Sequence, residues 1–205
     1  FNTVGPGWFL KIEPDPQHPG RYERRYATAL GARSAATISN VAAARGRAYI
    51  VGAAGPGFDT TANVVQGAAP SSTVNAVVLC IDPGAGVLVY STYLGGPHGG
   101  GATGVAVDDD GTAWITGWTD DTALATPGAV FSTFAPPGFS TTPKSGHAAF
   151  VAHITANGTG TGPTVAPWFG NGPLYLTYLS GKGSDRGVAV FRTRRSSTLV
   201  FGKST

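Results

Sequence analysis

The sequence predicts an all-β fold built from tandem four-stranded antiparallel units. The first reason is composition: the 205 residues include 31 Gly and 15 Pro, while only 12% are charged. Gly and Pro destabilise helices, and so few charges leave little material for solvated helix faces. A disordered chain is the competing interpretation, but 4 Trp, 7 Tyr and 10 Phe occur among short runs of Val and Ile that can bury surface.

The second reason is an internal repeat of three short signatures in one fixed order. The tyrosine signature reads YATALGA at 26–32, YSTYLGG at 90–96 and YLTYLSG at 175–181. Another reads RAYIVG at 47–52, TAWITG at 112–117 and STLVFG at 197–202. The last reads WFLKIE at 8–13, VVLCID at 77–82 and FVAHIT at 150–155. A fourth pattern, GVAV, occurs at 104–107 and 187–190, with a degenerate SNVA at 39–42.

Each signature has the pattern of a strand, and turn residues separate the signatures. TAWITGW alternates small or polar with large apolar residues, which is typical of a strand. DPGAG, DDDG and NG stand between signatures as turns. The tyrosine signature starts at residues 26, 90 and 175, hence 64 and 85 residues apart, which indicates an insertion in the second copy. Four strands per period fit one blade of a β-propeller, whereas a sandwich would not repeat the same four strands.

The pattern resembles a known bacterial repeat. VVLCIDPGAGVLVYSTYLGG, then GVAVDDDGTAWITGWT, TPGAVF and HAAFVAHITANG are similar to the SBBP-type β-propeller repeat, most clearly over residues 77–155. The resemblance implies an extracytoplasmic protein (periplasmic, cell-surface or secreted) and informs fold far more than activity. It also assigns four strands to a blade: A (GVAV), B (AWITG), C (FVAHI) and D (LVYSTYL).

With that assignment the chain reads CD, ABCD, ABCD, AB, which makes twelve strands. We expect one domain over 1–205, composed of a half blade (1–32), a blade (33–96), a blade (97–181, with an insertion at 157–173) and a half blade (182–205). Joining the two half blades would give only three blades, fewer than natural propellers use. We therefore expect a fragment of a larger propeller, a combination of copies, or openly packed sheets, with terminal strands that pair with each other, with a second copy or with another subunit.

The core is predicted from the apolar positions of the three copies. We expect burial of Ile50, Val78, Val105, Trp114, Ile115, Phe150, Val188 and Val200, with Trp114 fully buried. The single cysteine, Cys80, lies in VVLCID and is interpreted as a small buried hydrophobe rather than a reactive thiol.

Two groups of charged residues are predicted on one face of the blades. The A–B and C–D turns share this face, here called the turn face, and the D–A and B–C loops share the opposite one, the loop face. The turn face receives Asp108, Asp109 and Asp110, together with Arg192, Arg194 and Arg195. The aspartates could help to hold Ca²⁺, but the alternating ligands and closing Glu of a loop site are missing, so a solvated turn is favoured. The arginines suit an acidic partner or a phosphate, or form an exposed basic turn.

An aromatic pair in the 157–173 insertion is the main candidate for partner binding. Trp168 and Phe169 stand in a Gly/Pro-rich segment, where they either anchor a partner or fold back onto their own blade.

No catalytic, metal or cofactor site is predicted from the sequence. The four histidines lack metal-ligand spacing, no GxSxG motif occurs, and the terminal GKST lacks the first Gly of a P-loop. The net charge of +3 comes without a basic stripe among aromatics, so a nucleic-acid partner is not expected. No apolar run reaches the roughly 20 residues of a membrane span.

Two functions remain in competition. The leading one is a non-catalytic, propeller-like module that presents loops to a protein partner or to further copies of itself, as a subunit of an extracytoplasmic or membrane-attached assembly. The alternative is a glycan-binding protein or a hydrolase or lyase with a site at the central mouth. Convergent Asp, Glu or His residues on the loop face would favour the alternative.

Overall fold

The computed structural model describes residues 7–31, 34–134, 146–159, 175–181, 183–193 and 197–205. These residues form twelve β-strands and no helix, so the predicted all-β class is confirmed. The strands are β1 (Gly7–Pro14), β2 (Tyr22–Leu30), β3 (Ala36–Ala44), β4 (Arg47–Ala54), β5 (Asn75–Asp82), β6 (Val87–Leu94), β7 (Gly100–Val107), β8 (Ala113–Thr119), β9 (Ala148–Ile154), β10 (Tyr175–Leu179), β11 (Asp185–Arg192) and β12 (Thr198–Ser204).

The strands form four antiparallel sheets in the predicted sequence order. β1–β2 is a two-stranded sheet, β3–β6 and β7–β10 are four-stranded meanders, and β11–β12 is again two-stranded. The β3–β6 and β7–β10 sheets are called the first and second complete sheets below. Each sheet lies within one of the four expected segments, and most of the 157–173 insertion lies outside the described residues.

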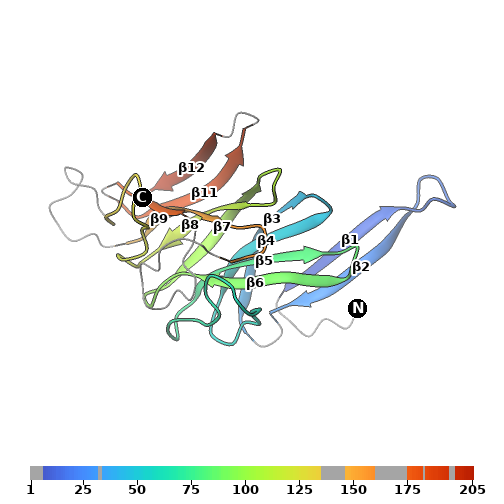
Figure 1. The fold of residues 1–205 in the computed structure, drawn as a ribbon, viewed down its shortest axis with the longest axis horizontal. Helices are drawn as coiled ribbons and strands as arrows, with labels where there is room; N and C mark the ends of the chain where they lie inside the picture. The colour runs from blue at the N-terminus through green and yellow to red at the C-terminus, as the bar shows by residue number, and fades with distance from the viewer. Residues whose placement is uncertain (1–6, 32–33, 135–145, 160–174, 182, 194–196) are drawn as a thin grey trace.

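The sheets stack face against face in a row (Figure 1). β7 packs against β3, β4 and β5, and β11 packs in the same way against β7, β8 and β9. One apolar core fills the space between the two complete sheets, and a second one lies between the N-terminal pair and the first complete sheet. The β1–β2 and β11–β12 pairs stand at opposite ends of the row, so they do not join into a third complete sheet within the chain.

The sheets share their irregularities as well as their order. The first strands of three sheets, β3, β7 and β11, carry a β-bulge at the same place, at Ser39, Thr103 and Val188, which are 64 and 85 residues apart like the tyrosine signatures. The two GVAV segments start 83 residues apart and therefore do not occupy equivalent positions. The structural repeat is set by strand pairing, and the GVAV match is offset from it by two residues.

Most of the predicted core is confirmed, and part of it is wrong. The buried residues are Ile50, Val78, Val105, Ile115 and Phe150. Cys80 is also buried, and this burial raises the pKa of its thiol to about 11. Trp114 and Val200 are only partly buried, and Val188 is exposed. The reason is their place in the row of sheets. Trp114 faces the narrow β11–β12 pair, and that pair is the last sheet, with nothing described on its outer side.

Candidate functional site

On the turn face, two predicted site residues meet across the chain. Arg192 Nε donates to Asp108 Oδ1 at 2.5 Å, although the residues are 84 positions apart. Trp114 Nε1 donates to Asp108 Oδ2 at 2.9 Å, and the Arg192 guanidinium lies 4.8 Å from the centre of the Trp114 ring. Because Asp108 follows β7 and Arg192 ends β11, this cluster fastens the last pair of strands to the second complete sheet.

Asp109 and Asp110, the other described turn-face candidates, make different hydrogen bonds. Asp110 Oδ1 accepts from the backbone N–H of Thr112 at 2.8 Å, and this hydrogen bond lowers the pKa of Asp110. The backbone carbonyl of Asp109 accepts from Arg45. Within the described part of the chain no three His, Cys, Asp or Glu side chains gather as a metal site. The remaining candidates, Trp168, Phe169, Arg194 and Arg195, lie outside the described residues.

His153 also belongs to the turn-face cluster, through contact with Trp114. Its ring stacks on the indole at 4.3 Å between centroids and 19° between planes. Burial lowers the pKa of His153, and its buried Nε2 has no hydrogen-bond partner among the described residues. The stack therefore contains a half-buried imidazole, and its lowered pKa keeps it neutral at neutral pH.

Acidification is expected to destabilise the fold through His153. Its ordinary pKa is 6.5 and its folded pKa is lower, so the unfolded chain binds the proton more readily. The stability that His153 contributes is present above pH 6.5 and is lost as the pH falls through the folded pKa. Urea unfolding at pH 7.5 and pH 5.5 should show a smaller acid-induced loss in His153→Phe than in the parent chain. An equal loss in both would contradict the assignment, and His18→Gln, at an exposed histidine, is the control.

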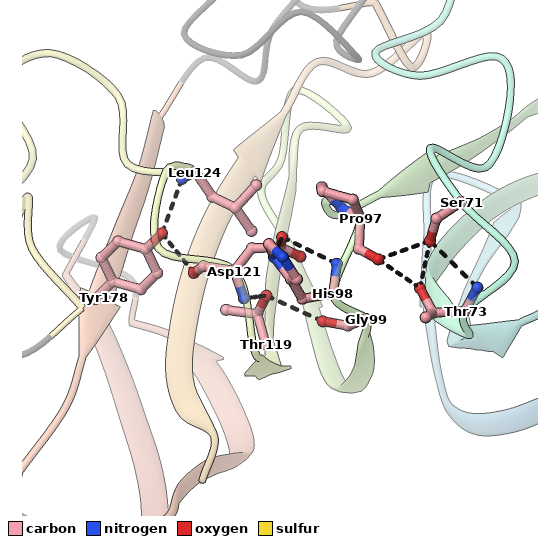
Figure 2. A network of polar contacts seen from close by, with 9 residues as sticks. All are labelled: Ser71, Thr73, Pro97, His98, Gly99, Thr119, Asp121, Leu124 and Tyr178. Atoms are coloured by element: carbon pink, nitrogen blue, oxygen red, sulfur yellow. Dashed lines mark hydrogen bonds and ion pairs between the residues drawn. The ribbon is translucent and has the colours of Figure 1, made fainter. Parts of the chain in front are cut away.

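On the loop face, a buried carboxylate supports an exposed histidine (Figure 2). Asp121 Oδ1 lies 2.7 Å from His98 Nδ1 and accepts from the His98 backbone N–H at 3.1 Å. Asp121 is buried while the His98 side chain is mostly exposed. Asp121 Oδ2 is also buried and has no partner among the described residues. A side chain at Gly96 would lie 2.4 Å from the Asp121 carboxyl group, so only glycine permits this approach.

Hydroxyl groups extend this network to a neighbouring loop (Figure 2). The hydroxyl groups of Ser71 and Thr73 donate to the carbonyl of Pro97, at 2.7 and 3.2 Å. Thr119 Oγ1 donates to the carbonyl of Gly99 at 3.2 Å. The network therefore ties the D–A loop around His98 to the B–C loops of both complete sheets.

A second histidine–aspartate pair lies on the same face. His147 Nδ1 contacts Asp120 Oδ1, and the His147 ring lies 4.2 Å from the Trp118 ring. The guanidinium of Arg186 covers Trp118 at 5.1 Å. Sequence reasoning missed both pairs, because their members are 23 and 27 residues apart. For His98–Asp121 a signal was available in the expectation that D–A and B–C loops meet on one face, whereas Asp120 and His147 both belong to one B–C loop.

The second tyrosine of the tyrosine signature anchors a B–C loop in each complete sheet. The Tyr178 hydroxyl accepts from the Leu124 N–H and donates to the Asp121 carbonyl, both at 2.8 Å. The Tyr93 hydroxyl likewise accepts from the Phe58 N–H at 2.9 Å and donates to the Gly55 carbonyl at 2.7 Å. The repeated tyrosine thus holds the loop that presents Asp121.

Replacing Tyr178 by Phe is expected to lower the free energy of unfolding by about 1–3 kcal/mol, because two buried backbone groups lose their partner. Chemical denaturation measures the loss. Tyr175→Phe is the matched control, since the hydrogen bond that its hydroxyl accepts from Val130 is exposed and its loss should change stability little. Equal losses in the two variants would contradict the anchoring role.

The loop-face arrangement can bind a polar ligand or transfer a proton at His98, because a buried carboxylate fixes the imidazole. The contacts described for His98 include no serine or cysteine that it could activate. No protein-family model matches the chain, and no curated protein shows significant similarity to it. The described residues contain no helix of the length and apolarity needed to cross a membrane.

Proposed function

We propose that this chain is a non-catalytic, propeller-like interaction module that binds protein strands at its two open ends. The proposal rests on one observation: the sheet at each end of the row has two strands, whereas each complete sheet has four. A sheet edge recruits a further strand through main-chain hydrogen bonds, with side-chain pockets adding specificity.

Exposed apolar side chains at these ends support the proposal. Large hydrophobic residues of both pairs are solvent-exposed: Trp8 and Ile12 on β1, Phe191 on β11, and Leu199 and Phe201 on β12. Phe191 and Phe201 pack edge-to-face at 5.8 Å on the outside of the last pair. Apolar groups gathered in this way are typical of a surface that another protein covers.

The module is further proposed to work outside the cytoplasm, as a member of the SBBP-type repeat proteins. The support for this part is the resemblance of its repeat, which is strongest over residues 77–155. The assembly it belongs to would then be periplasmic, surface-exposed or secreted.

Strand addition can be tested with a labelled peptide of residues 7–14, GWFLKIEP, which is the strand β1. The acceptor is the Trp8→Glu chain, whose own β1 is a poorer donor strand while its β12 edge is unchanged. Fluorescence anisotropy should show saturable binding of the peptide and none of a scrambled version. If the acceptor binds neither peptide, the proposed function is wrong.

A second candidate function rests on the loop face. The His98–Asp121 and His147–Asp120 pairs bring acidic and basic side chains together there, as a glycan-binding site or a hydrolase or lyase would require. Calorimetric titration with a panel of acidic and neutral oligosaccharides tests this candidate. The candidate is supported if the chain binds an oligosaccharide and the His98→Asn variant does not. It is wrong if no oligosaccharide of the panel binds.

A further inference from the structure

The two terminal pairs are the two halves of one complete sheet. β1–β2 has the register of β5–β6, including a bulge at the same place, after Lys11 in one and after Cys80 in the other. β11–β12 has the register and the bulge of β3–β4 and β7–β8. The N-terminal pair therefore supplies strands C and D, and the C-terminal pair supplies strands A and B.

Exposure at equivalent positions shows what each half lacks. Trp8 is 62% exposed, whereas its equivalents Val77 and Phe150 are 0% and 2% exposed. Ile12 is 57% exposed, whereas Ile81 and Ile154 are at most 1% exposed. On the other half, Phe201 is 59% exposed and its equivalents Val51 and Thr116 are fully buried. Each half thus exposes the positions that neighbouring strands and sheets cover in the complete sheets.

We propose that β12 of one copy pairs with β1 of a second copy of this chain, and that two copies close into a ring of six four-stranded sheets. Each copy contributes two complete sheets and the two halves of a third. Two copies therefore make four complete and two composite sheets, within the roughly four to eight of natural propellers. The two contacts are identical by two-fold symmetry, so the ring is closed and the open edges of β12 and β1 are both paired. This proposal rests on the proposed strand addition and names its partner.

The complete sheets fix the register of the missing contact. Ile50 pairs with Leu79 and Ile115 with Ala152, without a bulge between strands B and C. The equivalent alignment places Val200 opposite Leu10, Gly202 opposite Trp8 and Thr198 opposite Ile12. It also places no like charges opposite each other, since Lys11 faces Leu199 and Lys203 faces Gly7.

A cavity beside the open edge of β12 lies where this register places the Trp8 side chain of the second copy. It measures about 230 Å³ and is lined by Ala149, Leu179 and Gly202 among others. Phe150, the equivalent of Trp8, packs in one cluster with Ala76 and Leu94, which are the equivalents of Ala149 and Leu179. The register therefore directs Trp8 of the second copy toward this cavity.

Ala29 supports a composite sheet without a B–C loop. Ala29 stands where Tyr93 and Tyr178 anchor the B–C loops of the complete sheets. A sheet whose B and C strands come from different chains needs no anchor for such a loop, and the first tyrosine signature has none.

Sedimentation of the isolated chain tests the dimer. The expected mass is twice that of the 20.8 kDa chain, and Phe201→Glu should raise the dimer dissociation constant about thirtyfold or more. Val130→Glu, at an exposed apolar residue away from both ends, should leave it unchanged. A monomer throughout the micromolar range overturns the dimer. If that monomer still binds the 7–14 peptide, strand addition stands and only the identity of the partner fails.

Cross-linking tests the register. An equimolar mixture of Leu199→Cys and Lys11→Cys chains should give a disulfide or short thiol cross-link between copies. The Lys203→Cys chain should not link to Lys11→Cys, because four residues along a strand span about 13 Å. The native Cys80 is buried and its raised pKa keeps it unreactive at neutral pH. The proposed pairing is wrong if both mixtures give equal yields, or if only the mixture of Lys203→Cys and Lys11→Cys chains is cross-linked.

Discussion

Replacing Phe150 by Ala is expected to lower the free energy of unfolding by about 3–5 kcal/mol. Phe150 is a buried residue of strand β9 and belongs to the core between the two complete sheets. Truncation leaves a cavity between sheets that are both held by their own hydrogen bonds and cannot collapse around it. Urea unfolding followed by tryptophan fluorescence measures the effect.

A surface variant separates this effect from a general sensitivity to truncation. Val130→Ala, at an exposed position, should change the free energy of unfolding by less than about 0.5 kcal/mol. If Phe150→Ala lowered the free energy of unfolding as little as Val130→Ala, the core between the two complete sheets would not be the main apolar contact of the fold.

Replacing Gly117 by Ala is expected to lower the free energy of unfolding by about 3 kcal/mol or more. A Cβ atom at Gly117 would lie 2.0 Å from the carbonyl oxygen of Gly101 on the paired strand. The equivalent Gly52 is in the same situation, with the carbonyl of Thr37 at 1.9 Å. Because the clash is with backbone, no side-chain rotation relieves it, and the sheet itself must open. Denaturation midpoints of the two variants measure this cost.

Gly202 is the matched control for these glycines. It occupies the same position in the β11–β12 pair, but its nearest backbone oxygen, that of Arg186, would lie 3.0 Å from a Cβ atom. A two-stranded sheet can move by the few tenths of an ångström that this requires, so Gly202→Ala should cost much less than Gly117→Ala. Equal costs at the three glycines would show that backbone conformation, and not the close approach, requires glycine there.

The sequence by itself determined the strands and their order along the chain, whereas their division into sheets was an expectation from the resemblance of the repeat. The alternation in segments such as TAWITGW and the turns DPGAG and DDDG act over a few residues, so they can be read locally. The insertion in the second copy followed from the spacing of the tyrosine signatures. The half sheets at both ends followed from the strand assignment that the resemblance to the SBBP-type repeat implied. The burial of Ile50, Ile115 and Phe150 followed from the same alternation.

Only the tertiary structure decided which face of a strand is covered and by how much. Trp114 has the alternation of a core residue, yet it is only partly buried because the sheet on its side has two strands. The pairs Asp108–Arg192 and His98–Asp121 join residues 84 and 23 positions apart, which local patterns do not relate. The GVAV segments look equivalent but are shifted by two residues, because a bulge and the pairing with the next strand set the register. Burial and register depend on neighbouring sheets, and that information is not contained in any one segment of the chain.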